Sequence, residues 1–346
     1  MTMKTRKTII LEQLIRCSRI GSCSKGGRYR SGSTYASGAA PPFPFFKTRA
    51  MPHPFPRGLL ALSLWTALVA ASPDTPVTGA AVAPPPASLG LDPFYAKYLD
   101  AAGIPVVSSA KVPDEALRVA RDIVLAETAK RPDIQAELVR SGARVGVMAI
   151  DEGTMDLPEQ RDWKKPAADD PRLTPCERAN YAGIAAMTDA QYWNARARGM
   201  GGLYTTGAAE NLLAVPGTRY YGENILVHEF SHNILSAVER IDPALYHRVE
   251  QAYRHALDQG LWKGDYASVT IQEYWAEGTQ FWFNSNMAYR HDGKVLLSDR
   301  DLRAYDPMLH AVLAEVYTPS HRIAADAFHD HPARLTPPRP RKANAC

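Results

Sequence analysis

Cysteine is scarce in this chain, and several patterns that would indicate other functions are missing. Only four of the 346 residues are cysteine, and no two of them form a Cys-x-x-Cys pair. A zinc site built from thiolates is therefore not expected. The sequence contains no internal repeat and no glycine-rich loop followed by Lys-Ser or Lys-Thr, which argues against a repeat architecture and a P-loop nucleotide site.

Positive charge is missing where a nucleic-acid-binding surface would need it. The formal net charge of +4 averages two unlike parts. Residues 1–50 carry ten Lys or Arg and one acidic residue, whereas residues 73–346 carry 29 basic and 35 acidic residues. Because the part expected to fold is mildly acidic, we expect no nucleic-acid partner.

The apolar run from Gly58 to Ala71 is too short to span a bilayer comfortably, so no stable membrane anchor is expected. It follows a basic residue and ends in small residues, which predicts a signal peptide over 51–71 with cleavage after Ala71. The protein is then secreted or periplasmic. Translation is expected to start at Met51, with residues 1–50 a mis-assigned N-terminal extension; a basic targeting extension is the alternative.

The chain beyond the predicted signal peptide divides into three parts. Residues 72–90 are rich in Pro and Ala and are expected to form an unstructured linker. Residues 91–331 are expected to form one catalytic domain, and residues 332–346 a disordered tail. Cys176 and Cys346 follow the cleavage site and can form one disulfide in an oxidising compartment; two free thiols are the alternative.

The stretch His228-Glu229-Phe230-Ser231-His232 is the most informative in the chain. Positions four apart lie on one face of a helix, so His228 and His232 can bind one metal ion with Glu229 beside them. This is the H-E-x-x-H arrangement of zinc peptidases, in which the glutamate is a base rather than a ligand. The alternative is a helix with two surface histidines and a solvated glutamate. The surrounding pattern predicts a helix over 223–239 that buries Leu226, Phe230, Ile234 and Ala237.

A tetrahedral zinc ion needs a third protein ligand, and a second predicted helix offers one. Glu273 and Glu277 are four apart and hence share a helical face. One of them can bind the metal while the other hydrogen-bonds a ligand histidine. The alternative is that Glu273 forms a capping box with Thr270 and serves only its own helix.

Residues 222–283 resemble the family of the anthrax lethal factor catalytic domain and the Pro-Pro endopeptidases, which share a gluzincin-type fold. The resemblance is carried by His228-Glu229-x-x-His232, Tyr266 and Glu273-Tyr274-Trp275-Ala276-Glu277. It implies that Glu273 is the third ligand of one Zn²⁺ ion, that Glu277 supports the site, and that Tyr266 donates a hydrogen bond to the oxyanion of the reaction. Gly278-Thr279 departs from the family, where a small residue followed by a large apolar one is expected.

Hydrophobic periodicity predicts the remaining elements. Helices are expected over 113–130, 243–259, 270–286 and 307–317, with a shorter one after Pro132, and a buried strand over 144–150. Residues 151–202 are expected to be a long loop region. Residues 203–213 form either an edge strand that pairs with an extended substrate or a connecting loop. The expected fold class is α+β: a zincin-like metallopeptidase domain, mostly helical, with a small sheet beside the active-site helix.

Five further histidines in the last third of the folded part show no partnered ligand spacing on a predicted helix. They are expected at the surface: His291, His310, His321, His329 and His331.

These patterns predict a zinc-dependent endopeptidase that acts on a peptide or protein substrate outside the cytoplasm. His228, His232 and Glu273 would bind the metal, and Glu229 would accept a proton from water and return it to the leaving amine. Two alternatives stay open: a zinc-dependent amidase that acts on a non-protein amide, and a catalytically inactive zincin-fold binding or toxin module.

Overall fold

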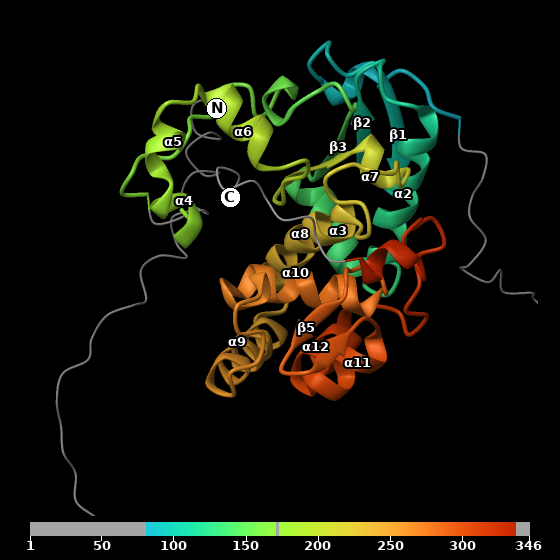
Figure 1. Cartoon of the computed structure of the whole chain (residues 1–346). Coiled ribbons are helices and arrows are strands. Elements are labelled where there is room, and N and C mark those ends of the chain that lie inside the picture. Colours follow the sequence, from blue (N-terminus) through green and yellow to red (C-terminus); the bar gives the residue numbers. More distant parts are fainter. Residues whose placement is uncertain (1–80, 171–172, 337–346) are drawn as a thin grey trace, which may run out of the picture. The chain divides into compact units, whose positions relative to one another are not determined.

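The computed structural model describes residues 81–170 and 173–336 (Figure 1). The predicted N-terminal extension, the signal peptide with its cleavage site and the first part of the predicted linker lie outside these residues. Within them, no helix is both long enough and apolar enough to cross a membrane. The fold is α+β, as expected: a small mixed sheet and a larger set of helices.

The sheet has four strands, in the spatial order β1 (Lys97–Ala101), β2 (Ile104–Ser108), β3 (Arg144–Met148) and β4 (Tyr204–Ala208). β1 and β2 form an antiparallel pair, whereas β2–β3 and β3–β4 are parallel. A parallel connection needs a long crossover, and the β2–β3 crossover consists of α2 (Asp114–Thr128) and α3 (Pro132–Ser141). The strand predicted over 144–150 is confirmed as β3. Of residues 203–213, only 204–208 form the expected edge strand, β4, and the pairing of this strand with a substrate stays a prediction.

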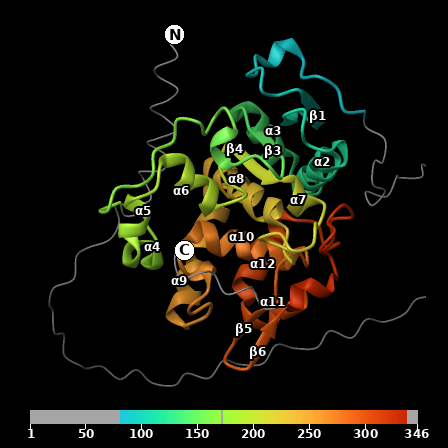
Figure 2. The same ribbon diagram turned by 45° about the horizontal axis from the view of Figure 1, so that its top comes forward.

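The predicted helices of the second half are confirmed, with ends that differ by a few residues. They are α8 (Ile225–Ile241), α9 (Pro243–Asp258), α10 (Ile271–Trp282) and α12 (Pro307–Val316). Figures 1 and 2 show α8 between the sheet and the group formed by α9, α10, α12 and the further helix α11 (Asp299–Tyr305). Among the elements of this half that the sequence did not predict are α7 (Ala209–Leu212), β5 (Tyr289–His291), β6 (Lys294–Leu296) and α11.

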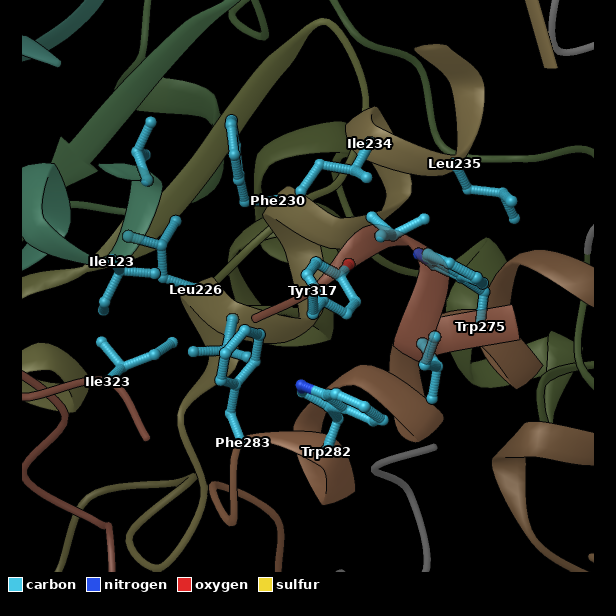
Figure 3. Packing of buried hydrophobic residues seen from close by; sticks show 14 of the residues in the cluster. Ile123, Leu226, Phe230, Ile234, Leu235, Trp275, Trp282, Phe283, Tyr317 and Ile323 are labelled. Atoms are coloured by element: carbon cyan, nitrogen blue, oxygen red, sulfur yellow. The ribbon is translucent and has the colours of Figure 1, made fainter. Parts of the chain in front are cut away.

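The predicted apolar face of α8 is buried in the main core. Leu226, Phe230, Ile234 and Ala237 are all at most 1 % exposed. Figure 3 shows Leu226, Phe230 and Ile234 around Tyr317, with Trp275 and Phe283 beside them. Burying one large apolar side chain stabilises a fold by about 1.5–3 kcal/mol, so this face fixes the rotation of α8.

The region 151–202 is not the continuous loop expected from its composition. It contains three short helices, α4 (Pro175–Ala179), α5 (Tyr181–Ala185) and α6 (Asp189–Arg196). Thr174 and Thr188 close capping boxes at the starts of α4 and α6, and such local hydrogen bonds need no apolar periodicity. Cys176 in α4 is disulfide-bonded; Cys346, the partner expected from the sequence, lies outside the described residues.

Each outer strand of the sheet, β1 and β4, pairs at a single residue with a segment outside the sheet. Ala83 forms two backbone hydrogen bonds with Tyr98 of β1. Met200 forms two with Thr206 of β4, of 2.8 and 3.2 Å. The expectation of an unstructured linker over 72–90 is therefore wrong for the residues around Ala83, because strand pairing satisfies their backbone groups.

The disordered tail predicted from residue 332 begins too early. Pro332–Leu335 forms a 3-10 helix, and Arg334 is only 3 % exposed. Its guanidinium donates to the carbonyl oxygens of Asn286, at 2.7 Å, and Leu297. A buried guanidinium needs such acceptors, and they are contributed by residues distant in sequence.

The start of α8 is held by one fully buried side chain. The Asn224 Oδ1 atom accepts the backbone N–H of Leu226 at 3.1 Å, and its Nδ2 atom donates to Asp326 at 2.8 Å. The Asn224 carbonyl also accepts from the Gln280 side chain of α10 at 3.0 Å. Asn224 therefore caps α8 and ties it to two other parts of the domain.

We predict that Asn224→Ala lowers the free energy of unfolding by about 2–3 kcal/mol. A lost N-cap costs about 1 kcal/mol, and Asp326 also loses a donor while fully buried, which costs at least about 1 kcal/mol more. Thr188→Ala, which removes only the cap of α6, is the control and should cost about 1 kcal/mol. Urea denaturation measures both, and equal losses would contradict the prediction.

Candidate metal centre

Three side chains predicted as ligands meet between α8 and α10. The Oε2 atom of Glu273 lies 3.0 Å from Nε2 of His228 and 3.6 Å from Nε2 of His232. The three ligand atoms lie within 4.8 Å of one another, an arrangement that can hold a metal ion. Glu273 and His228 are 45 positions apart in the sequence, so only the packing of the two helices brings them together.

The packing around α10 explains why a residue without a side chain stands at Gly278 and a buried hydroxyl at Thr279. A Cβ atom on Gly278 would lie 2.7 Å from the Leu309 side chain of α12, so a larger residue would push the helices apart. Thr279 is fully buried, and its hydroxyl donates to the Trp275 carbonyl oxygen at 2.9 Å. The two residues fit this particular contact between α10 and α12.

The alternative role of Glu273, capping its own helix with Thr270, holds for the Glu273 backbone N–H but not for its carboxylate. The Thr270 hydroxyl accepts the Glu273 backbone N–H at 3.2 Å and so caps α10. The Glu273 carboxylate points instead to the two histidines. Thr270 and Glu273 therefore start the helix and supply the third candidate ligand at the same time.

His228 is oriented by a residue that the sequence did not single out. Its Nδ1 atom lies 3.0 Å from Oε1 of Gln280 and 3.7 Å from Oε1 of Glu277. The Gln280 oxygen can only accept, so Nδ1 carries a proton. Nε2 donates to the Glu273 carboxylate while His228 is protonated, and a metal ion bound there would replace that proton. Glu277 lies behind the ring and accepts from Asn286 at 2.6 Å.

A glycine-containing segment lies directly on His232 and Glu229. A Cβ atom on Gly201 would come within 2.5 Å of the His232 ring, and one on Gly199 within 3.1 Å of the Glu229 side chain. Arg198 anchors this segment through a two-point ion pair with Glu210, with distances of 2.7 and 3.0 Å. Glycine is required here because the backbone approaches the two side chains so closely.

Glu229 lies beside the candidate ligands without joining them. Its Oε2 atom is 4.0 Å from Nε2 of His232, and its carboxylate accepts the backbone N–H of Gly201. Burial raises the pKa of Glu229 to about 7. A carboxylate with this pKa can both accept and release a proton near neutral pH.

Tyr266 and Arg196 lie on the exposed side of the centre. The Tyr266 ring stacks on the His228 ring at a centroid distance of 6.4 Å, and its hydroxyl is hydrogen-bonded to Glu273. Arg196, at the end of α6, acts electrostatically on both Tyr266 and Glu229. Its Nε atom donates to Glu177 at 2.9 Å, which holds the guanidinium in place. Arg196 had no sequence signal, since α6 itself was not predicted.

The charges of the centre favour a cation between the two helices. Burial tends to raise the pKa of Glu273, but His232 and His228 outweigh it and hold that pKa near 2. Burial tends to lower the pKa of His228, but Glu273 outweighs it and raises that pKa to about 10. Burial lowers the pKa of His232 to about 4, so this imidazole is neutral and its lone pair is available.

We predict that Gly201→Ala weakens the affinity of the centre for Zn²⁺ by about tenfold or more, because the added methyl group must displace the His232 ring. A tenfold change corresponds to about 1.4 kcal/mol, a modest cost for moving a ligand. Gly183→Ala is the matched control, since a Cβ atom there meets nothing within 4 Å. Competition with a chelator measures both affinities; an unchanged value for Gly201→Ala would show that the ring is not held there.

We also predict a pH effect in metal-free protein. Burial, with Asp265 nearby, raises the pKa of Glu277 to about 8 from its ordinary 4.5. The stability that this group contributes is therefore full below pH 4.5 and is lost as the pH rises toward 8. Glu277→Gln should remove part of the decline of the thermal midpoint between pH 5 and pH 8, with a difference of several degrees. Parallel declines in the two proteins would contradict this.

The chain was also compared with protein-family models, with curated proteins and with solved structures, and none of the three comparisons found a match.

Proposed function

We propose that this protein is a zinc-dependent endopeptidase with a zincin-like fold that acts outside the cytoplasm. The observation that carries the proposal is the meeting of His228, His232 and Glu273 with Glu229 beside them. Two imidazoles from one helix and a carboxylate from another are the donor set of His₂Glu zinc peptidases. Glu273 lies at 3.0 and 3.6 Å from the two ring nitrogens, a spacing that a shared ion accounts for.

The residues present fit a zinc ion. Nitrogen and carboxylate oxygen donors suit Zn²⁺, and the Gln280 contact at 3.0 Å orients the His228 ring as ligand histidines require. When bound, the ion would supply a Lewis acid that polarises a carbonyl group and makes a water molecule more acidic.

Glu229 is the candidate general base. Its carboxylate lies on the same side as the three ligands, and burial keeps its pKa near 7. It can take a proton from the attacking water and deliver it to the amine that leaves when the peptide bond breaks. The Gly201 N–H that it accepts would hold the carboxylate in one orientation.

Tyr266 and Arg196 are suited to negative charge that develops on the substrate oxygen. Burial raises the pKa of the Tyr266 hydroxyl above its usual value, so it keeps its proton and can donate. Its side chain is 43 % exposed and accessible to a substrate. The Arg196 guanidinium adds a fixed positive charge on the same side. Donors held in place before the reaction stabilise such an oxyanion effectively.

We predict that Glu229→Gln lowers peptidase activity by at least about 10²–10⁴-fold, because the proton acceptor is lost, while the zinc content stays that of the unchanged protein. Glu239→Gln is the matched control, since Glu239 is an exposed residue of the same helix. Digestion of a peptide library measures activity, and elemental analysis measures zinc.

The outcomes separate the alternatives. A Glu229→Gln protein with wild-type activity would refute the proposed base. Zinc-loaded wild-type protein that cleaves non-protein amides but no peptide would favour an amidase. If wild type and variant both retain zinc and neither cleaves any amide, the protein is a binding module.

A further inference from the structure

A second group of potential metal ligands lies outside the centre described above. It consists of Asp299, the first residue of α11, His310 of α12, and His321, which follows α12. Their ligand atoms lie within 4.8 Å of one another. The sequence had placed His310 and His321 at the surface as unrelated residues, but both are half-buried against the Trp282 ring, at centroid distances of 4.9 and 4.2 Å.

The tautomer of His321 suits a ligand. Its Nδ1 atom lies 3.2 Å from the backbone carbonyl oxygen of Trp282, which can only accept, so Nδ1 carries the proton. The Nε2 atom therefore presents a lone pair. Ligand histidines are commonly oriented by a hydrogen bond of this kind from the other ring nitrogen.

The distance between His321 and Asp299 suits a shared ion better than a direct bond. Nε2 of His321 and Oδ2 of Asp299 are 3.7 Å apart, which is too long for a hydrogen bond. Two ligand atoms about 2.0–2.1 Å from a tetrahedral zinc ion are roughly 3.3 Å apart. A small contraction would bring both atoms to that spacing.

Asn284 holds the two residues in position. Its Nδ2 atom donates to Oδ1 of Asp299 at 3.3 Å and to the His321 carbonyl oxygen at 3.0 Å, and its Oδ1 atom accepts the Asp299 backbone N–H at 3.2 Å. Oδ1 of Asp299 is thereby engaged, and Oδ2 is directed toward His321. His321 adopts a left-handed backbone with φ of 52°. Such conformations persist where the surroundings impose them, often at functional sites.

We propose that Asp299, His310 and His321 form a second site for a divalent transition-metal ion, with Zn²⁺ the best match. Two imidazoles and one carboxylate favour zinc over calcium or magnesium, which prefer oxygen ligands. The site joins α11 and α12 to Trp282, the last residue of α10. An ion there would stabilise this part of the domain, and the inference does not depend on the proposed peptidase activity.

The test is the zinc content of the full chain after equilibration with Zn²⁺ alone. Both His310→Gln and Asp299→Asn should lower it by one ion per chain. His255→Gln, a substitution of an exposed histidine on α9, is the control and should leave the content unchanged. Asp299→Asn keeps the shape of the side chain and an acceptor for Asn284, so loss of the fold would not explain its effect.

A combination of variants separates this site from the candidate metal centre. His232→Gln should also lose one ion, and His232→Gln with His310→Gln should retain none. If the centre at His232 binds no zinc, His310→Gln still removes the remaining ion. Zinc should raise the thermal midpoint of His232→Gln but not of the double variant. Zinc content unchanged in both His310→Gln and Asp299→Asn would overturn the site and leave only an ion pair between Asp299 and His321.

Discussion

The packing of α10 against α8 is the contact on which the candidate metal centre depends. α8 presents His228, Glu229 and His232 on one face because its opposite face is buried in the core. That face has no third ligand of its own. α10 supplies Glu273 at its first turn and Gln280 two turns later, and Gln280 reaches both the His228 ring and the Asn224 carbonyl at the start of α8. One glutamine thus sets the tautomer of a candidate ligand and the position of the helix that carries it.

The local features of this arrangement could be read from the sequence. A spacing of four on a helix puts His228 and His232 on one face, and a second pair with that spacing marked Glu273 and Glu277 as candidates for the third ligand. The starts of α9 and α12 could also be predicted, because the pairs Asp242-Pro243 and Asp306-Pro307 each place an N-cap residue before a proline at the first helical position. Apolar periodicity then identified the main helices and the buried strand β3.

What the sequence could not provide depends on contacts between distant segments. Gln280 is an ordinary helical residue until α10 is packed against α8. Arg196 is brought to the centre by the short helix α6, which a local cap at Thr188 starts. The composition of residues 151–202 favours a loop, so neither α6 nor the position of Arg196 could be predicted. Asp299, His310 and His321 come from separate elements with no shared spacing. Strands β1 and β2 lack an uninterrupted apolar run like that of β3, because β1 contains Lys97 and Asp100 and β2 contains Pro105.

The pairing of Met200 with Thr206 affects whether the sheet can pair, edge to edge, with the sheet of another copy of the protein. An exposed strand edge is a template on which another chain can add, and proteins commonly cover or interrupt such edges. Here Met200 covers β4 at Thr206, its middle residue, and Ala83 covers β1 at Tyr98, its second residue. Neither edge therefore offers an uninterrupted row of amide and carbonyl groups. The four-stranded sheet is thereby protected against edge-to-edge aggregation, and this protection is lost if either covering segment detaches.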